Sequence, residues 1–307
     1  RVYGVIGISS IMANWNADFS GFPKTTSDGS TFGSDKALKF PMKKMWQQEG
    51  KKVLYIKSMC FQEKKGEVTL VPRSLKERYE CIFEVEELKK STDAKTVITN
   101  LMQAIDVKNF GATFAEEGNN IAITGAVQIG QGFNKYTGIN AEEQQILSPF
   151  RDASEDKKDA KNSTLGTKIV SNEAHYFYPF VINPKAYDEL VELGVTEGYT
   201  EEDYAAFKKA ALVSATAFAT NSKVGCENEF ALFVETEADT YLPNLSEYVD
   251  FEKKADKNLI CVKFGAILSE LKEAVKKVEI YYNPYTTELD CDIKTAEIFN
   301  ILTQKEV

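Results

Sequence analysis

The order of strands and helices constrains the fold of this chain most, because a strand–helix–strand unit occurs twice. The first unit is predicted over Val2–Ser10, Ser34–Gln48 and Lys51–Met59, and the second over Ala174–Ile182, Thr200–Thr220 and Glu229–Glu235. Between the units, residues 60–95 and 148–172 are charged and weakly periodic, as expected of insertions or loops. This order predicts an α+β fold with a ferredoxin-like core and extra lobes.

Capping signals support two of the predicted helices. Ser34 is suited to the N-cap position, and Thr200 and Asp203 have the spacing of a capping box. Pro41 removes one backbone hydrogen bond, so we expect either a kink or a separate turn before a helix that opens at Pro41. Three further elements are predicted: a helix over Thr96–Asn109, a strand over Asn120–Ile129 and a helix over Ala266–Lys277.

Composition excludes several classes of protein. Apolar residues make up 43% of the 307 residues, and no uncharged apolar stretch approaches the roughly 20 residues of a membrane-spanning helix. We therefore expect no role at a membrane, and five cysteines without a C-x-x-C pair predict a reduced, cytoplasmic protein. The single histidine, His175, lies in an aromatic strand and argues against zinc and Ser-His-Asp chemistry. We expect no metal and no cofactor.

Charge is distributed unevenly along the chain. Residues 1–60 carry a net charge of +5, residues 61–185 carry −2 and residues 186–307 carry −12, for a total of −9. At physiological salt a surface field extends only about 8–10 Å. A basic face near the amino end can therefore bind a polyanion although the whole chain is acidic.

A polar loop followed by a lysine-bearing helix is the strongest candidate site. The loop spans residues 12–32, and its aromatic residues argue against disorder. Lys36, Lys39 and Lys43 share one face of the predicted helix. Phosphate backbones are bound by repeated cationic and amide donors along one surface. The candidate residues are Asn14, Asn16, Lys24, Ser34, Lys36, Lys39 and Lys43. The alternative is a solvated helix face beside a polar loop.

The glycine-rich segment at 125–138 is a weaker candidate. It lacks the Lys and Ser/Thr that follow the second glycine of a Walker A loop, so we expect a tight turn at the end of a strand. Gln131, Asn134 and Lys135 in this turn could contact sugar or phosphate. Asp18 stands in the N-terminal loop, where we expect it to orient a loop amide rather than bind a metal.

Several segments together resemble a known family. They are MANWNADFSGFPKT, GSDKALKFPMKKMW, AIDVKNFGATF, ITGAVQIGQGFNK and EAHYFYPFVINPKAY. In this order they resemble the backbone subunit of the Cascade effector complexes of type I CRISPR systems, the CRISPR-associated protein seven family, and within it the subtype I-B branch. The resemblance extends from the first strand to about residue 290 and is weakest in 60–95 and 150–170.

The resemblance implies an RRM-like palm with inserted fingers and a hairpin thumb. The palm would comprise residues 1–59, 96–146 and 173–307, the fingers residues 60–95, and the thumb residues 147–172. Such subunits stack head to tail along the crRNA guide, an interface that does not close on itself. The subunits hold the guide backbone beside the other Cascade subunits, while the guide bases pair with the target DNA strand, as in other RNA-guided effectors.

The resemblance also implies roles for individual residues. Asn16 and Lys24 match guide-backbone contacts in the loop, and Ser34, Lys39 and Lys43 match the start of the RNA-binding helix. The thumb residues, placed by their order in the chain, are Phe150, Arg151, Leu165 and Lys168. The chain departs from many relatives in using lysine where arginine is frequent, with only four arginines. Lysine neutralises phosphate without a bidentate geometry.

We therefore predict a non-catalytic scaffold that binds guide RNA. The first alternative is a metal-dependent target-RNA nuclease of type III-like character that uses Asp18. The second is a general single-strand RNA-binding module with an RRM-like sheet. The lack of an evident aromatic pair of the RNP type on a strand argues against the second alternative.

Overall fold

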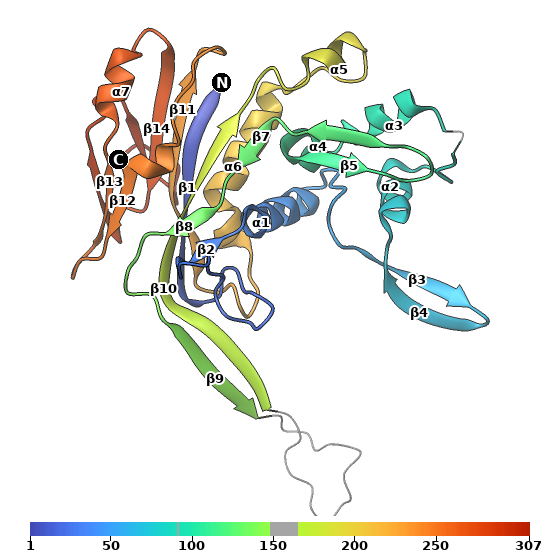
Figure 1. The fold of residues 1–307 in the computed structure, drawn as a ribbon, viewed down its shortest axis with the longest axis horizontal. Coiled ribbons are helices and arrows are strands. Elements are labelled where there is room, and N and C mark those ends of the chain that lie inside the picture. The colour runs from blue at the N-terminus through green and yellow to red at the C-terminus, as the bar shows by residue number, and fades with distance from the viewer. Residues whose placement is uncertain (91, 148–164) are drawn as a thin grey trace, which may run out of the picture.

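A computed structural model describes residues 1–90, 92–147 and 165–307 (Figure 1). Its largest sheet has nine strands, in the order β16-β14-β11-β1-β10-β8-β2, with β7 and β9 also paired to β10. The strands are β1 (Val2–Ala13), β2 (Phe32–Gly33), β7 (Val127–Ile129), β8 (Gly132–Asn134), β9 (Ala141–Leu147), β10 (Leu165–Ile182), β11 (Cys226–Thr236), β14 (Val275–Tyr282) and β16 (Glu297–Asn300). All pairs are antiparallel except β14 with β16.

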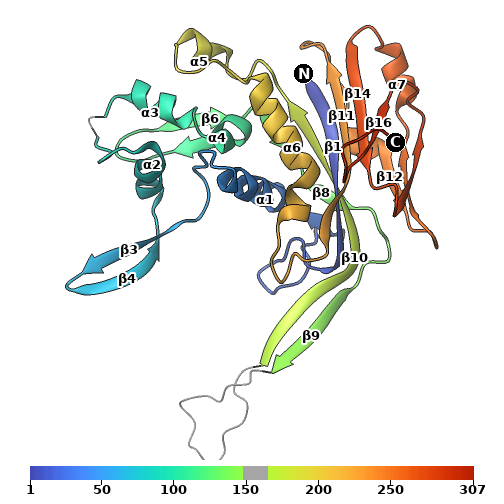
Figure 2. The same cartoon turned by 180° about the vertical axis from the view of Figure 1, so that it is seen from behind.

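Helices cover one face of this sheet and a smaller sheet covers the other (Figures 1 and 2). The helices are α1 (Asp35–Gln48) and α6 (Glu201–Ala217), and Trp46 and Phe207 pack with Ile6 of β1. The next residue toward the amino end, Val5, packs on the opposite face, as the alternation of a strand requires. That face is covered by β12 (Val249–Glu252), β13 (Asn258–Val262), β15 (Thr287–Cys291) and α7 (Gly265–Glu270).

A third core forms a separate lobe beside α1 (Figure 1). It contains α2 (Leu75–Phe83), α3 (Ala94–Leu101), α4 (Ile105–Phe110), β5 (Gly111–Phe114) and β6 (Ile121–Thr124). Two hairpins project from the molecule: β3 (Met59–Lys64) with β4 (Glu67–Pro72), and β9 with the first half of β10. The short elements α5 (Asp188–Glu192) and η1 (Leu245–Tyr248) complete the fold. Within the described residues, no helix is long and apolar enough to cross a membrane.

The α+β class and most of the two predicted units are confirmed. Strands are present where β1, β10 and β11 were expected, and His175 lies within β10. Ser34 caps α1, and Thr200 with Asp203 forms the capping box of α6. Helix α1 runs through Pro41 as one element, so the alternative of a separate preceding turn is wrong.

The prediction of a strand over Lys51–Met59 is wrong. A carboxylate from a distant part of the chain, and not a neighbouring strand, accepts the backbone N–H groups of this segment. Asp106 accepts the backbone N–H of Leu54 on one oxygen and that of Tyr55 on the other, both at 2.8 Å. The segment is irregular until β3 begins at Met59. A buried N–H needs one acceptor, and here a side chain supplies it.

Three other predicted elements have different bounds. The helix expected over Thr96–Asn109 is interrupted, because the chain turns so that the N–H of Ile105 donates to the carbonyl of Lys52 at 2.9 Å. The strand expected over Asn120–Ile129 divides at Gly125, where a side chain would lie within 2.5 Å of the backbone of Asn109. The helix expected over Ala266–Lys277 ends early because Val275 and Lys277 pair with β11.

Candidate nucleic-acid interface

Side-chain amides hold the N-terminal loop in place. The Nδ2 of Asn14 donates to the carbonyls of Gly21 at 2.8 Å and of Ile169 at 3.1 Å, which joins the loop to β10. The Oδ1 of Asn16 accepts the backbone N–H of Ser34 at 2.8 Å, which joins it to the start of α1. The loop is therefore an ordered part of the molecule. Asn14 is buried, so its amide serves to hold the loop in place, whereas Asn16 is partly exposed.

Asp18 shapes a tight turn within the loop. Its Oδ1 accepts the backbone N–H groups of Ser20 at 2.8 Å and Phe22 at 3.0 Å, and its own N–H donates to the carbonyl of Phe22. This agrees with the expectation that Asp18 orients loop amides. Within the described part of the chain, no group of three or more His, Cys, Asp or Glu side chains could hold a metal ion.

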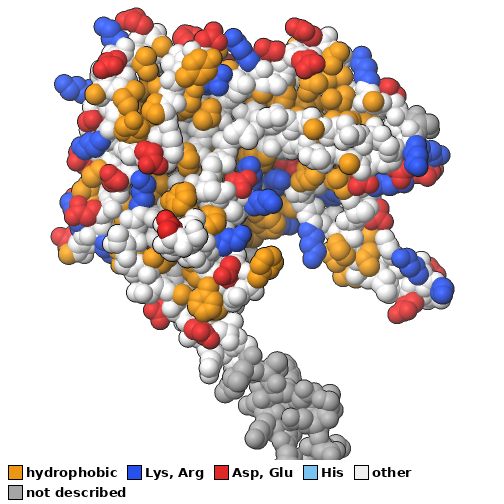
Figure 3. Space-filling model, viewed as in Figure 1, with side chains coloured by type: hydrophobic (Ala, Val, Ile, Leu, Met, Phe, Trp, Pro, Cys, Tyr) orange, Lys and Arg blue, Asp and Glu red, His pale blue; other side chains and the backbone are white. Residues whose placement is uncertain are grey.

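The three predicted lysines of α1 lie along one groove of about 680 Å³. Its walls are the lysine face of α1 on one side and α4, β5 and β6 on the other. The lining residues are Asp35, Lys36, Lys39, Phe40, Lys43, Tyr55, Phe110, Gly111, Ala112, Thr113 and Ile123. Three cations against one carboxylate make this groove positive. In Figure 3, basic and hydrophobic side chains gather in the hollow between the main body and the projecting β3–β4 hairpin.

The three lysines differ in their exposure to solvent and in their ion pairs. Lys36 is exposed and has no ion pair among the described residues, whereas Lys39 contacts Asp35 at 2.8 Å. Lys43 lies 3.5 Å from Asp106 and donates to the carbonyl of Tyr55. Burial lowers the pKa of Lys43, and the charge of Asp106 opposes this shift. Lys36 is thus the exposed cation of the groove, whereas the side chains of Lys39 and Lys43 are only 15% and 16% exposed and each contacts a carboxylate.

Aromatic residues that no sequence pattern indicated complete the groove. The Nζ of Lys39 lies 5.1 Å from the ring centroid of Phe110, and that of Lys43 lies 5.7 Å from the ring of Tyr55. Phe40 is 41% exposed between the lysines of α1. Cations interleaved with aromatic rings can bind phosphates and bases together. Phe40 was detectable from its place among the lysines, but Tyr55 and Phe110 come from other elements.

Lys24 and Ser34 lie at the loop end of this region. The backbone N–H of Lys24 donates to the carbonyl of Asn16 at 3.0 Å, and the Lys24 side chain is partly exposed. The hydroxyl of Ser34 accepts the N–H of Ala37 at 3.4 Å as the N-cap of α1. The loop and the helix start are therefore joined by hydrogen bonds.

The glycine-rich turn does not join the lysine groove. Asn134 accepts the N–H of His175 at 2.8 Å, and Lys135 donates to the carbonyl of Ser246 at 2.8 Å, so both side chains hold neighbouring elements together. Gln131 is exposed. Of the three residues proposed for the turn, Gln131 is the most exposed, whereas Asn134 and Lys135 are partly exposed and engaged within the protein.

The residues expected in the thumb are only partly described. Lys168 is partly exposed in β10, and its Nζ donates to the Oδ1 of Asn221 at 3.3 Å. Leu165 opens β10. Phe150 and Arg151 lie outside the described residues.

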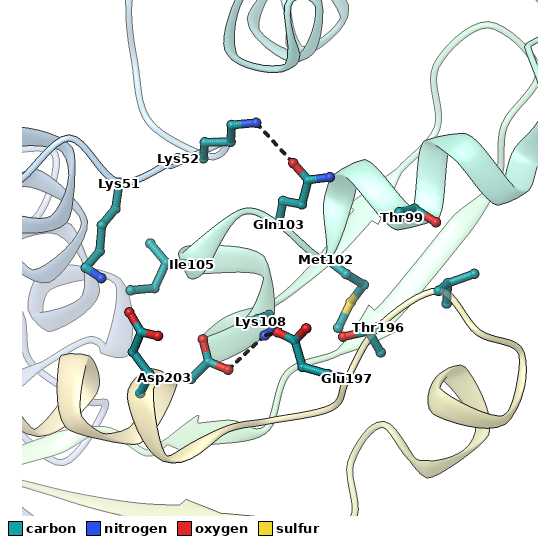
Figure 4. A pocket seen from close by; sticks show the side chains of 12 residues that line it. Lys51, Lys52, Thr99, Met102, Gln103, Ile105, Lys108, Thr196, Glu197 and Asp203 are labelled. Atoms are coloured by element: carbon teal, nitrogen blue, oxygen red, sulfur yellow. Dashed lines mark hydrogen bonds and ion pairs between the residues drawn. The ribbon is translucent and has the colours of Figure 1, made fainter.

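A second cleft, of about 490 Å³, lies between α3, α4 and the start of α6 (Figure 4). Three of its charged groups contact one another, since Lys108 lies 2.8 Å from Asp203 and 3.0 Å from Glu197, and Lys52 donates to the amide of Gln103 at 3.0 Å. These pairs hold the lobe against α6. The lining of this cleft carries three lysines and three carboxylates, so it has no net positive charge, unlike the lysine groove.

Comparison with known proteins identifies the family. The family model of CRISPR-associated protein Cas7 matches residues 1–268. A solved chain of a "CRISPR RNA-guided surveillance complex, pre-nicking" is similar in fold, with a TM-score of 0.54 and 13% identity over 98% of this chain and 96% of that chain. A chain of another "CRISPR RNA-guided surveillance complex" has a TM-score of 0.46 and 14% identity over 92% and 91%. No curated protein gives a significant match. Because the family model covers most of its length, this chain belongs to the CRISPR-associated protein Cas7 family.

Proposed function

We infer that this chain is a non-catalytic backbone subunit of a type I Cascade complex, of the I-B branch. It binds the crRNA guide along its lysine groove and stacks head to tail with copies of itself and with other Cascade subunits. The guide bases remain free to pair with target DNA. Membership of the Cas7 family and the similarity to a surveillance-complex chain support this role.

Strand order supports a ferredoxin-like palm. The elements β1, α1, β7, β10, α6 and β11 follow the order β-α-β-β-α-β along the chain. In the sheet, β11 pairs with β1, β1 pairs with β10, and β10 pairs with β7. All three pairs are antiparallel. This order and pairing support the proposal of a split βαβ palm, with β7 in place of the strand expected at 51–59. The β3–β4 hairpin would belong to the fingers and the β9–β10 hairpin to the thumb.

The lysine groove is the single observation that carries the proposal. It brings together Lys36, Lys39 and Lys43 with Phe40 and Phe110, at the end of α1 that the N-terminal loop contacts. Cations neutralise phosphates without reading sequence, as a guide backbone requires. The strongly acidic C-terminal part supplies other elements of the fold and does not line this groove.

Replacing Lys36 and its neighbour Lys39 tests the proposal. The Lys36→Ala/Lys39→Ala variant should bind single-stranded RNA about tenfold or more weakly. The slope of log K against log salt is negative, and each lost phosphate contact makes it shallower by about 0.7. The slope of the double variant should therefore be shallower than that of wild type by about 1.4. Affinity should not depend on RNA sequence. Lys43 is left intact because its contact with Asp106 also stabilises the fold.

A matched control uses two exposed lysines near α7. Lys272 and Lys276 have exposed side chains and lie away from the groove. Lys272→Ala/Lys276→Ala should keep the wild-type affinity and salt slope. RNA copurifying with the groove variant in wild-type amount, or an equal loss in both variants, would contradict the assignment of the groove.

A further inference from the structure

Phe19 is the most exposed large apolar side chain among the described residues. Its relative exposure is 112%, so almost nothing in the molecule contacts it. The neighbouring Phe22 is 40% exposed. A large aromatic side chain held fully in water has an unfavourable hydration free energy that a bound ligand would relieve.

The turn that carries Phe19 is held by its own hydrogen bonds. Asp18 accepts two backbone N–H groups, Gly21 donates to the carbonyl of Asp18 at 3.2 Å, and Ala17 and Pro23 form a bridge. Gly21 has a φ of +89°, a conformation that favours glycine. The backbone under Phe19 is therefore already ordered. A contact made by this ring loses little backbone entropy on binding.

Phe40 connects the lysine groove with the loop that carries this turn. Phe40 lines the lysine groove and also a small pocket of about 180 Å³ between α1 and the loop. Asn16 and Ala17 line the loop side of that small pocket. Phe19 follows Ala17 by two residues. A strand of nucleic acid that leaves the groove past Phe40 would therefore meet the turn.

The surroundings of Phe19 favour a nucleobase over a protein surface. The direct neighbours Asp18 and Ser20 are polar, and Phe22 is the other large apolar side chain exposed in this turn, so the turn offers a smaller apolar area than a typical protein interface. A single exposed ring suffices for stacking on a base, because every base has a π-face. The carboxylate of Asp18 is engaged by N–H groups of the turn and does not need to contact the ligand.

We propose that Phe19 stacks on a base of the bound single-stranded RNA at the end of the lysine groove, and that Asp18 positions the turn for this contact. The proposal rests on the proposed function, because it needs RNA in the groove. It adds a base contact, where the groove itself supplies phosphate contacts. The contact is independent of base identity.

Fluorescence of 2-aminopurine, placed at successive positions of a single-stranded RNA, tests the contact on the full chain. Wild type should quench the probe at particular positions. Phe19→Ala should remove at least half of that quenching at some positions and weaken binding of a short RNA about tenfold, as expected for one lost stack. Phe19→Trp should retain quenching, whereas Phe19→Leu, which is apolar without a π-face, should not.

Phe61→Ala is the matched control, since Phe61 is a second exposed phenylalanine, 75% exposed on the β3–β4 hairpin. It should leave quenching at those positions unchanged. Unchanged quenching in Phe19→Ala with RNA still bound would overturn the proposal and leave the proposed function intact. Shorter assemblies with unchanged quenching would assign Phe19 to a protein contact and also overturn it. Failure of wild type to bind RNA would overturn the proposed function itself.

Discussion

The indole Nε1 of Trp15 donates a hydrogen bond of 2.6 Å to the hydroxyl of Tyr178, and both side chains are buried. Trp15 lies near the start of the N-terminal loop, and Tyr178 lies within β10. Gly33 packs directly against the Tyr178 hydroxyl, where a side-chain carbon would lie 1.8 Å away. Both ends of the loop therefore meet at one buried tyrosine, which links the central sheet to the candidate RNA surface.

The first prediction concerns this tyrosine. Tyr178→Phe leaves the buried indole N–H of Trp15 without an acceptor, which should cost about 1–3 kcal/mol of unfolding free energy. Thermal unfolding should therefore begin several degrees lower. Tyr285→Phe, at a ring that is 69% exposed, should leave the melting temperature unchanged. Equal melting temperatures for wild type and Tyr178→Phe would show that the bond contributes little.

The second prediction concerns Asp106, which accepts two backbone N–H groups and lies 3.5 Å from Lys43. Asp106→Ala leaves these donors and a largely buried ammonium unpaired, so it should destabilise the fold by about 3–5 kcal/mol. Lys43→Met in the same chain should recover part of the loss, because the unpaired charge is gone. Urea unfolding measures both effects.

Asp239→Ala is the control for Asp106. Asp239 pairs with Lys185 at 3.1 Å, and both side chains are exposed. Such surface pairs contribute about 0–1 kcal/mol. A loss in Asp106→Ala no larger than in Asp239→Ala would contradict the role of the buried carboxylate in ordering residues 51–58.

The third prediction is a pH dependence at His175. The imidazole lies 2.8 Å from Glu229 and 3.0 Å from Glu173, and stacks on Phe251 at 3.8 Å. Burial alone would lower the pKa of His175, but the two carboxylates outweigh it and raise the pKa. The charged form therefore stabilises the fold fully below the unfolded pKa of about 6.5, and this stability is lost as pH rises through the folded pKa.

Melting temperatures measured across this range test the pH dependence. Wild type should lose stability as pH rises above about 6.5. His175→Gln should be less stable at low pH and should lose this part of the slope. The comparison is direct because His175 is the only histidine of the chain. Identical slopes in the two proteins would exclude the imidazolium as a stabilising group.

Features set by local sequence could be predicted, and features set by distant partners could not. The lysine face of α1 follows from helical periodicity and the cap at Ser34, so both were predicted. Tyr55 and Phe110, which complete the groove, come from other elements, and no local pattern brings them together. The irregular path of residues 51–58 depends on Asp106, about 50 residues away.

The direction in which a side chain points from a turn could not be predicted from the sequence either. Asn134 and Lys135 have the composition of a phosphate-binding turn, yet both contact neighbouring protein elements. A polar residue in a turn has no periodicity to indicate which way it points. The same holds for Asn14, whose amide closes the loop onto β10.

The last prediction separates a positioning role of Asp18 from a catalytic one. Asp18→Asn keeps an acceptor oxygen for the N–H groups of Ser20 and Phe22, whereas Asp18→Ala removes it. If Asp18 only holds the turn, Asp18→Asn should bind RNA like wild type, and Asp18→Ala should bind it more weakly because the turn loosens. A metal-dependent nuclease would need the charge of the carboxylate, so both variants would lose cleavage. Incubating each protein with labelled RNA and Mg²⁺ distinguishes the two roles: we expect no cleavage by wild type, and cleavage that Asp18→Asn abolishes would instead make this chain an enzyme.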